Sequence, residues 1–164
     1  MDMSFTFRDV LLEQDLSGLT DVMESTGLFY DFEIEVALEV LQSFRDHGES
    51  SGYNCIVALE NGVCAGYVVY GPAPCTLSGW DIYWMAVRKE LQGKGLGSEL
   101  IHRAEKRIAL QGGTSVWIET SGRPAYLPTR KFYEKHQYQK LAELPGFYAP
   151  GDSKVIYGKT ISFS

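Results

Sequence analysis

The segment of this sequence best suited to chemistry is Gln92–Gly97, which reads QGKGLG and directly precedes an amphipathic stretch. The first turn of a helix carries backbone N–H groups without partners and the positive end of the helix dipole, and both attract phosphate. Three glycines leave room for a phosphate beside the backbone: Gly93, Gly95 and Gly97. Side-chain donors and the start of the helix complete this predicted site: Gln92, Lys94, Leu96 and Ser98.

Spacing excludes the two common nucleotide-binding loops. A Walker A loop needs Lys followed by Ser or Thr, whereas Lys94 is followed by Gly95. The dinucleotide fingerprint GxGxxG needs a third glycine where this chain has Ser98. The pattern that remains is QxxGxG. Glycines that merely form a turn before a helix are the alternative without a ligand.

The hydrophobic pattern predicts the elements that position this segment. Asn61–Gly62 separates two β-rich runs, Cys55–Glu60 and Val63–Tyr70, which predicts a hairpin with a type I′ turn. Further strands are predicted over 4–10, 81–87, 115–120, 138–143 and 154–161, and helices over 15–23, 31–44, 96–111 and 129–136. This order indicates one domain over residues 1–164, with an α/β fold whose mixed, mostly antiparallel central sheet is flanked by helices.

Composition restricts the classes of partner. The 164 residues carry a formal net charge of −6, which argues against nucleic acid and would favour a cationic partner such as a protonated amine. No apolar run approaches the roughly 18 residues that span a bilayer. The N-terminus MDMSFTFRDV also lacks the pattern of a signal peptide. We therefore expect a cytoplasmic protein that has no membrane partner.

Metal and disulfide chemistry are not expected either. The histidines are scattered along the chain: His47, His102 and His136. The cysteines are odd in number, lack CxxC spacing and lie in or beside apolar stretches: Cys55, Cys64 and Cys75. We interpret them as reduced core residues.

The strand, the QxxGxG segment and the helix that follows together resemble the GNAT superfamily of acyl-CoA-dependent N-acyltransferases, whose pyrophosphate motif is [QR]xxGx[GA]. The order of predicted elements resembles that fold over essentially the whole chain. The resemblance implies acetyl-CoA as the co-substrate, with its pyrophosphate on Gln92–Gly97 and Ser98. It also implies that the preceding strand splays from its neighbour to open a cleft for pantetheine, whose amides would pair with the main chain of Met85, Ala86 and Val87.

The resemblance also suggests catalytic residues. The segment KFYEK is similar to a family segment whose Tyr lies beside the CoA sulfur, which makes Tyr133 the expected general acid. A phenol, with an ordinary pKa of about 10, can protonate a departing thiolate while staying neutral beforehand. The attacking amine must lose a proton to a carboxylate, and Glu119 is the first candidate and Asp81 the second. Each of the three could instead be a structural or solvated side chain.

Two positions depart from the family pattern. Asn often contacts the cofactor seven residues before the catalytic Tyr, and Tyr126 stands there in this chain. We expect Tyr126 to take over the cofactor contact. The usual Gly-Phe after the short helix reads Gln137-Tyr138. The loop 121–128 is rich in Gly and Pro, which leaves the register between Glu119 and Tyr133 open.

Aromatic residues beside carboxylates mark the expected acceptor side. In this fold the acceptor enters opposite CoA, near the first helices and the last hairpin. The candidate substrate-binding residues are Phe29, Tyr30, Phe147 and Tyr148. Aromatic faces can hold a cation before it is deprotonated. The same rings could instead cover the edge of the core or form the contact of a homodimer, and the sequence leaves these alternatives open.

The leading hypothesis is an N-acetyltransferase that moves an acetyl group from acetyl-CoA to a primary amine of a small molecule or peptide. Direct attack is expected, because no Cys is suitably placed and Cys75 lies in a loop. The alternative is a catalytically inactive acyl-CoA-binding regulatory module. A purely structural interaction domain would leave the phosphate-type loop without a role.

Overall fold

The computed structural model describes residues 4–162, which form a seven-stranded sheet in the order β1-β2-β3-β4-β5-β7-β6. The strands are β1 (Phe5–Arg8), β2 (Asn54–Glu60), β3 (Val63–Pro72), β4 (Gly79–Val87), β5 (Ser115–Ser121), β6 (Gln139–Ala149) and β7 (Asp152–Thr160). The pair β4–β5 is parallel and the other neighbouring pairs are antiparallel. The predicted mixed, mostly antiparallel sheet is therefore confirmed.

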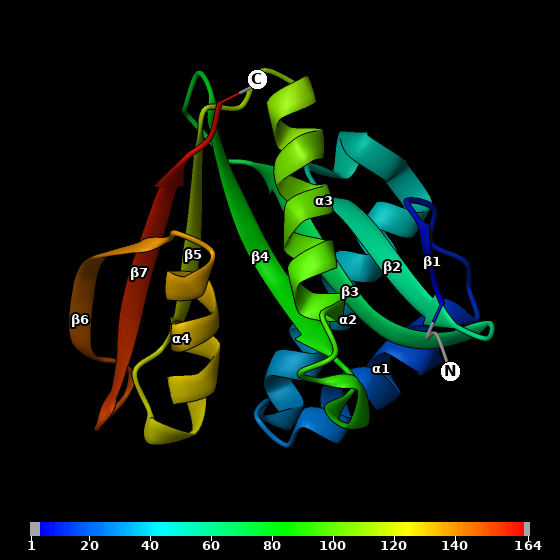
Figure 1. Ribbon diagram of the computed structural model, residues 1–164, viewed down its shortest axis with the longest axis horizontal. Helices are drawn as coiled ribbons and strands as arrows, with labels where there is room; N and C mark the ends of the chain where they lie inside the picture. The colour runs from blue at the N-terminus through cyan, green and yellow to red at the C-terminus, as the bar shows by residue number, and fades with distance from the viewer. Residues whose placement is uncertain (1–3, 163–164) are drawn as a thin grey trace.

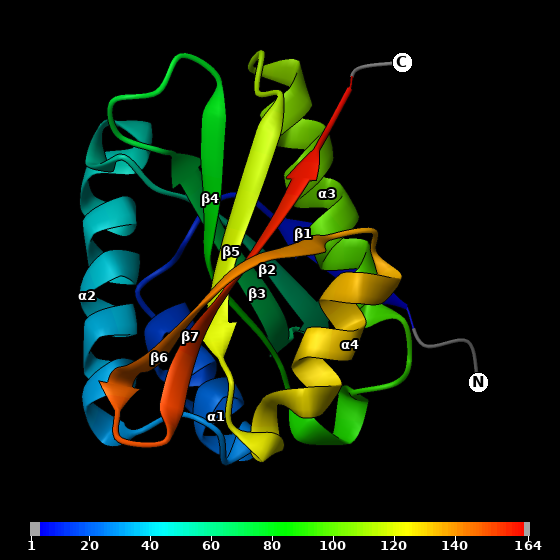
Figure 2. The same ribbon diagram turned by 90° about the vertical axis from the view of Figure 1, so that its left-hand side faces the viewer.

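Within residues 4–162, four α-helices cover the sheet, two on each face (Figures 1 and 2). They are α1 (Asp15–Thr26), α2 (Asp31–His47), α3 (Leu96–Leu110) and α4 (Leu127–Lys135). Buried side chains of α1 and α2 belong to one hydrophobic cluster, and those of α3 and α4 belong to another. The sheet separates the two clusters because alternate residues of a strand point to opposite faces.

The central hairpin forms as its turn residues predict. Asn61 and Gly62 have φ angles of 51° and 80°, and a type I′ turn needs positive φ at both positions. The turn pairs Glu60 with Val63 and sets the register of β2 against β3.

Two sequence expectations need correction. β6 extends to Ala149, past Pro145, because an edge strand needs no amide donor on its open side. Cys75 is exposed in the loop before β4 and is not a core residue, whereas Cys55 and Cys64 are buried and reduced. The apolar neighbours of Cys75 in the sequence do not cover it in the fold.

A helix that crosses a bilayer needs about 20 mostly apolar residues. Within residues 4–162, no helix is both long enough and apolar enough to cross a membrane.

Candidate functional site

Strands β4 and β5 pair along only part of their length. The pairs run from Gly79 with Ser115 to Ile82 with Ile118, and β4 continues to Val87 paired with β3 but not with β5. Figure 1 shows the two strands diverging from their paired ends toward the loop that leads into α3. The backbone of residues 83–87 therefore presents an edge with no strand on the β5 side. This is the splay that the resemblance implies.

The backbone of β4 alternates between its neighbour β3 and the open side. The Arg88 N–H donates to the Ala65 carbonyl at 2.8 Å, which assigns Ala86 to the β3 side and Met85 and Val87 to the open side. The Val87 carbonyl accepts a hydrogen bond from Gln92 Nε2 at 3.0 Å. The N–H groups of Met85 and Val87 are thus the ones directed toward the opening.

A bulge lies at the point where β4 separates from β5. Val69 pairs with Trp84 and Tyr70 with Ile82, so Tyr83 is an extra residue. A bulge bends its strand and increases the local twist. It explains why β4 leaves β5 directly after Ile82.

The glycine-rich loop opens α3 without a side-chain cap. Gly93 and Gly95 have φ angles of 76° and 87°, and a Cβ at either position would lie in open space. Gly95 is the N-cap residue, and no side chain bonds the first amides of α3. The N–H groups of this turn are therefore open to an anion, and the residues fit the pyrophosphate of acetyl-CoA.

Gly97 has a different reason to be glycine. A Cβ there would lie 3.3 Å from the ring of Phe132, which is tighter than ordinary van der Waals contact. The residue brings the first turn of α3 against α4. Its small size serves helix packing as well as access to the backbone.

The Ser98 hydroxyl lies 3.0 Å from Nε2 of His136, a buried side chain at the end of α4. The other ring nitrogen, Nδ1, lies 2.8 Å from the Phe132 carbonyl. A carbonyl only accepts, so Nδ1 carries a proton and donates to it, and Nε2 is the ring nitrogen that bonds the Ser98 hydroxyl. The contact holds the end of α4 beside the start of α3.

Tyr133 is buried on α4 within an aromatic cluster. Its ring centroid lies 6.2 Å from that of Tyr138 and 6.0 Å from that of Tyr157. Burial raises the pKa of Tyr133, so the phenol stays protonated. Within residues 4–162 the hydroxyl has no hydrogen-bond partner, and no fully enclosed polar side-chain atom lacks one. The hydroxyl therefore reaches accessible surface.

The two candidate carboxylates lie near the point where the strands part. Asp81 is on β4 beside Trp117 of β5, and Glu119 is the first residue of β5 after the last pair with β4. Burial and the negative charge of Glu119 raise the pKa of Asp81, while the Tyr83 hydroxyl opposes this shift. Glu119 forms an ion pair with Lys154, at 2.9 Å.

Phe147 and Tyr148, two of the aromatic residues expected on the acceptor side, lie around the lysine that pairs with Glu119. Lys154 Nζ lies 3.7 Å from the ring centroid of Phe147 and 5.9 Å from that of Tyr148. Burial and then the charge of Glu119 raise the pKa of Tyr148 to about 12. The last hairpin thus places two rings and a cation beside the Glu119 carboxylate of β5. Sequence reasoning missed Lys154, which is an ordinary strand residue in the linear pattern.

Arg123, also missed from the sequence, connects three segments of the acceptor side. Its guanidinium donates to the Tyr30 hydroxyl at 2.8 Å and lies 3.3 Å from a carboxylate oxygen of Asp152. It also lies over the rings of Tyr30 and Tyr126, at 4.8 and 5.2 Å. The turn before α2 is thereby joined to the loop after β5 and to the start of β7.

Tyr126 and Phe29 belong to the same region. The Tyr126 hydroxyl donates to the Leu28 carbonyl at 3.2 Å, so the side chain contacts the turn between α1 and α2. Phe29 is partly buried in that turn and packs against the cluster of α1 and α2. Tyr126 therefore holds the turn between α1 and α2, on the acceptor side, in place.

Two surface hollows lie away from this site. They have volumes of about 290 and 320 Å³, share Asp9 and Arg107, and lie toward the far end of α3 from the glycine loop. Among residues 4–162, no group of three or more His, Cys, Asp or Glu side chains could hold a metal ion.

Comparison with known proteins agrees with this geometry. The model of the GNAT acetyltransferase family matches residues 19–138. A protein of Desulfovibrio desulfuricans assigned to the GNAT family has 39% sequence identity and a TM-score of 0.92, over 96% of this chain and 99% of that chain. The comparison with curated proteins gives no match.

More distant structures share the fold. An aminoglycoside 6'-N-acetyltransferase complexed with coenzyme A has 17% identity and a TM-score of 0.76, over 99% of both chains. The ribosomal-protein-S18-alanine N-acetyltransferase of Escherichia coli has 17% identity and a TM-score of 0.75, over 98% of this chain and 96% of that chain.

Proposed function

Because the chain belongs to the GNAT family of acetyltransferases, we propose that it transfers the acetyl group of acetyl-CoA to a primary amine by direct attack. The observation that carries this proposal is the open edge of β4 beside the uncapped start of α3. Together they offer main-chain donors for an extended amide-containing chain and for a pyrophosphate.

The main chain of β4 would orient the thioester. The N–H groups of Met85 and Val87 face the opening, and either can donate to the thioester carbonyl oxygen. A donor directed at that oxygen stabilises the negative charge that develops during attack. The thioester supplies an activated acetyl group and a thiolate leaving group.

Glu119 and Asp81 would receive the proton of the acceptor ammonium. Both lie where β4 and β5 separate. The raised pKa of Asp81 makes its carboxylate a stronger base than an ordinary aspartate. The exposed Glu119 pairs with Lys154, which lies over the Phe147 ring of the last hairpin. The amine then forms the C–N bond while the C–S bond breaks.

Tyr133 would protonate the departing thiolate. Its raised pKa keeps the proton on the phenol until the thiolate forms. Carboxylates and aromatic rings line the acceptor side, which suits an acceptor that carries a positive charge on an apolar body. We therefore propose a small-molecule or peptide amine as the acceptor.

Thiol release from acetyl-CoA tests the proposal across a panel of polyamines, amino acids, aminoglycosides and N-terminal peptides. We expect turnover with at least one class, and about 100-fold lower kcat in Tyr133→Phe and Glu119→Gln with acetyl-CoA binding retained. Glu143→Gln is the matched control, because Glu143 pairs with Lys140 on β6, on the face of the sheet opposite to Lys154. Stabilisation by acetyl-CoA without turnover of any amine would favour a binding module instead.

A further inference from the structure

Lys154 occupies the position that an acceptor ammonium would need. Its Nζ lies 2.9 Å from a carboxylate oxygen of Glu119 and 3.7 Å above the ring of Phe147. Only 14% of the side chain is exposed. A carboxylate together with an aromatic face is the chemistry that holds a substrate ammonium in place.

The strand register brings this lysine to the reaction centre. Lys154 pairs with Ser121, and Glu119 pairs with Ile156 two residues further along β7, so both side chains point to the same face. Glu119 directly follows the last residue that pairs with β4. The amine is therefore paired with a carboxylate that stands where β4 and β5 part.

We propose that Lys154 is a self-acetylation site, modified by the protein's own acetyl-CoA when no acceptor is present. This inference rests on the proposed function. The Lys154 ammonium loses a proton to Glu119, and the neutral amine attacks the thioester carbonyl. A C–N bond forms, the C–S bond breaks, and the thiolate takes its proton from Tyr133. The amide nitrogen passes its second proton to the Tyr133 oxygen, and Glu119 releases its proton to solvent. The products are N-acetyllysine and CoA.

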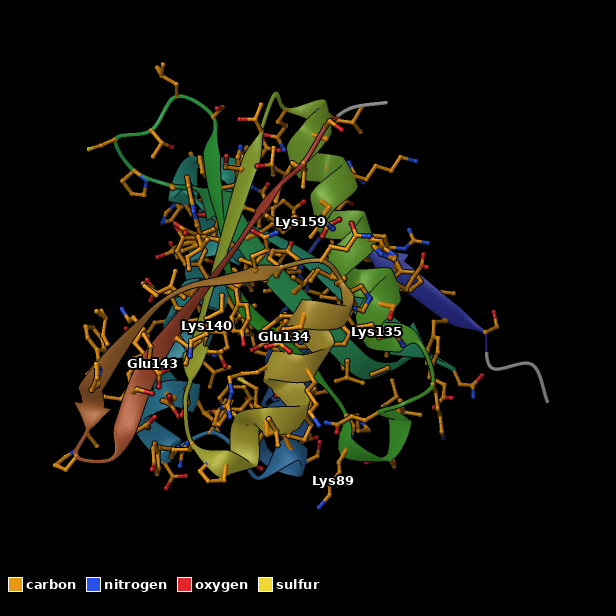
Figure 3. The ribbon with its side chains drawn as sticks, turned by 60° about the vertical axis from the view of Figure 1, so that its left-hand side comes forward. Lys89, Glu134, Lys135, Lys140, Glu143 and Lys159 are labelled. Atoms are coloured by element: carbon orange, nitrogen blue, oxygen red, sulfur yellow. The ribbon has the colours of Figure 1, made fainter. Side chains whose placement is uncertain are left out.

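Other lysines are placed differently (Figure 3). Lys140 pairs with Glu143 on β6, on the face of the sheet opposite to Lys154. Lys159 pairs with Glu105 of α3 at 2.9 Å. Lys135 is exposed at the end of α4, and Lys89 is exposed just before the glycine loop. None of these side chains pairs with Glu119 or Asp81, which makes them internal references for uncatalysed acetylation.

Acetylation would change the acceptor side. The resulting amide carries no charge, so it ends the ion pair with Glu119 and the cation–π contact with Phe147. Glu119 would then be free to bind an incoming ammonium. A true acceptor should compete with Lys154 for the same carboxylate and slow its modification.

The test is to incubate the full chain with acetyl-CoA alone and measure acetylation of each lysine by peptide mass spectrometry. We expect Lys154 to be modified faster than Lys135 and Lys89, at a rate independent of protein concentration. In Glu119→Gln the rate at Lys154 should fall about 100-fold, with Lys135 unchanged. In the intact mass of the protein, the acetyl group that forms fastest should be absent from Lys154→Arg. The same group should still be present in Lys140→Arg.

Three results would overturn the proposal. Lys154 could stay unmodified, it could react no faster than Lys135, or it could react equally fast in Glu119→Gln. Thiol release with an amine from the panel and an unmodified Lys154 would reject self-acetylation and leave the proposed function standing. Absence of both thiol release and Lys154 acetylation would reject the self-acetylation proposal and the proposed function. Thermal unfolding with and without acetyl-CoA confirms that each variant is folded and binds.

Discussion

The Ser98 hydroxyl and Nε2 of His136 lie 3.0 Å apart and join the first turn of α3 to the end of α4. Both helices contribute to the candidate site, since α3 carries the open amides and α4 carries Tyr133. The residues are 38 positions apart in the chain, so the contact exists only in the folded protein. It makes the position of α4 dependent on the start of α3.

Ser98→Ala should lower the free energy of unfolding by about 1–2 kcal/mol, because it leaves a ring nitrogen of buried His136 without a partner. His136→Ala should cost more, since it also removes packing against Phe132 at 4.3 Å. The double variant should be less destabilised than the sum by about 1 kcal/mol. Urea unfolding measures all three, and strict additivity would contradict the coupling. Ser50→Ala, at an exposed site, is the control.

Gly95→Ala should weaken acetyl-CoA binding about tenfold, which corresponds to about 1.4 kcal/mol. The φ of 87° strains any residue with a Cβ, so the loop can keep its shape only at an energetic cost. Titration calorimetry with acetyl-CoA measures the change. Unaltered affinity would show that the left-handed N-cap is not needed for the cofactor.

Gly97→Ala should act through packing. The added methyl group lies 3.3 Å from the Phe132 ring, and we expect a loss of about 1–2 kcal/mol in unfolding free energy. Phe132→Leu should be less costly in the Gly97→Ala background than in the parent chain, because the smaller side chain leaves space. Equal costs in the two backgrounds would rule out this contact as the cause.

Asp81 should make the fold less stable as pH rises. Burial and then the charge of Glu119 raise its pKa in the fold above the ordinary value of 3.8. Below that value Asp81 is protonated in both states and contributes nothing. Above the raised pKa it is ionised in both states, but the carboxylate is unfavourable only in the fold. The free energy of unfolding of Asp81→Asn, relative to that of the parent chain, should therefore be higher at pH 7 than at pH 4. Urea unfolding at both pH values measures this difference.

Asp15 provides the control of opposite sign. Burial would raise its pKa, but the hydrogen bonds from Arg8 and the Leu12 N–H lower it below the ordinary value. Its contribution to stability is present above the unfolded-state pKa and is lost as pH falls. Asp15→Asn should consequently be more destabilising at pH 7 than at pH 4. The same trend in both variants would contradict these assignments.

Local patterns account for most of what the sequence predicts. The Asn61–Gly62 turn, the glycine loop and the helix after it depend on neighbours within a few residues, and each forms at its predicted place. Contacts across the fold are not encoded in that way. Arg123 bonds Tyr30 across 93 positions, and Lys154 reaches Glu119 from another strand. Alternation fixes the face of each strand residue, but the partner strand decides what lies opposite.

Gln137→Gly should raise the free energy of unfolding by about 1 kcal/mol. Gln137 follows α4 with a φ of 68°, at a position where the family pattern has glycine and where a Cβ is strained. Its side chain is exposed, so the substitution removes strain with little loss of contact. Gln111→Gly is the matched control, since Gln111 ends α3 with an ordinary φ of −93° and glycine there should be neutral or destabilising. Thermal and urea unfolding compare the two, and a loss of stability in Gln137→Gly as large as that in Gln111→Gly would show that the left-handed backbone carries no strain in this chain.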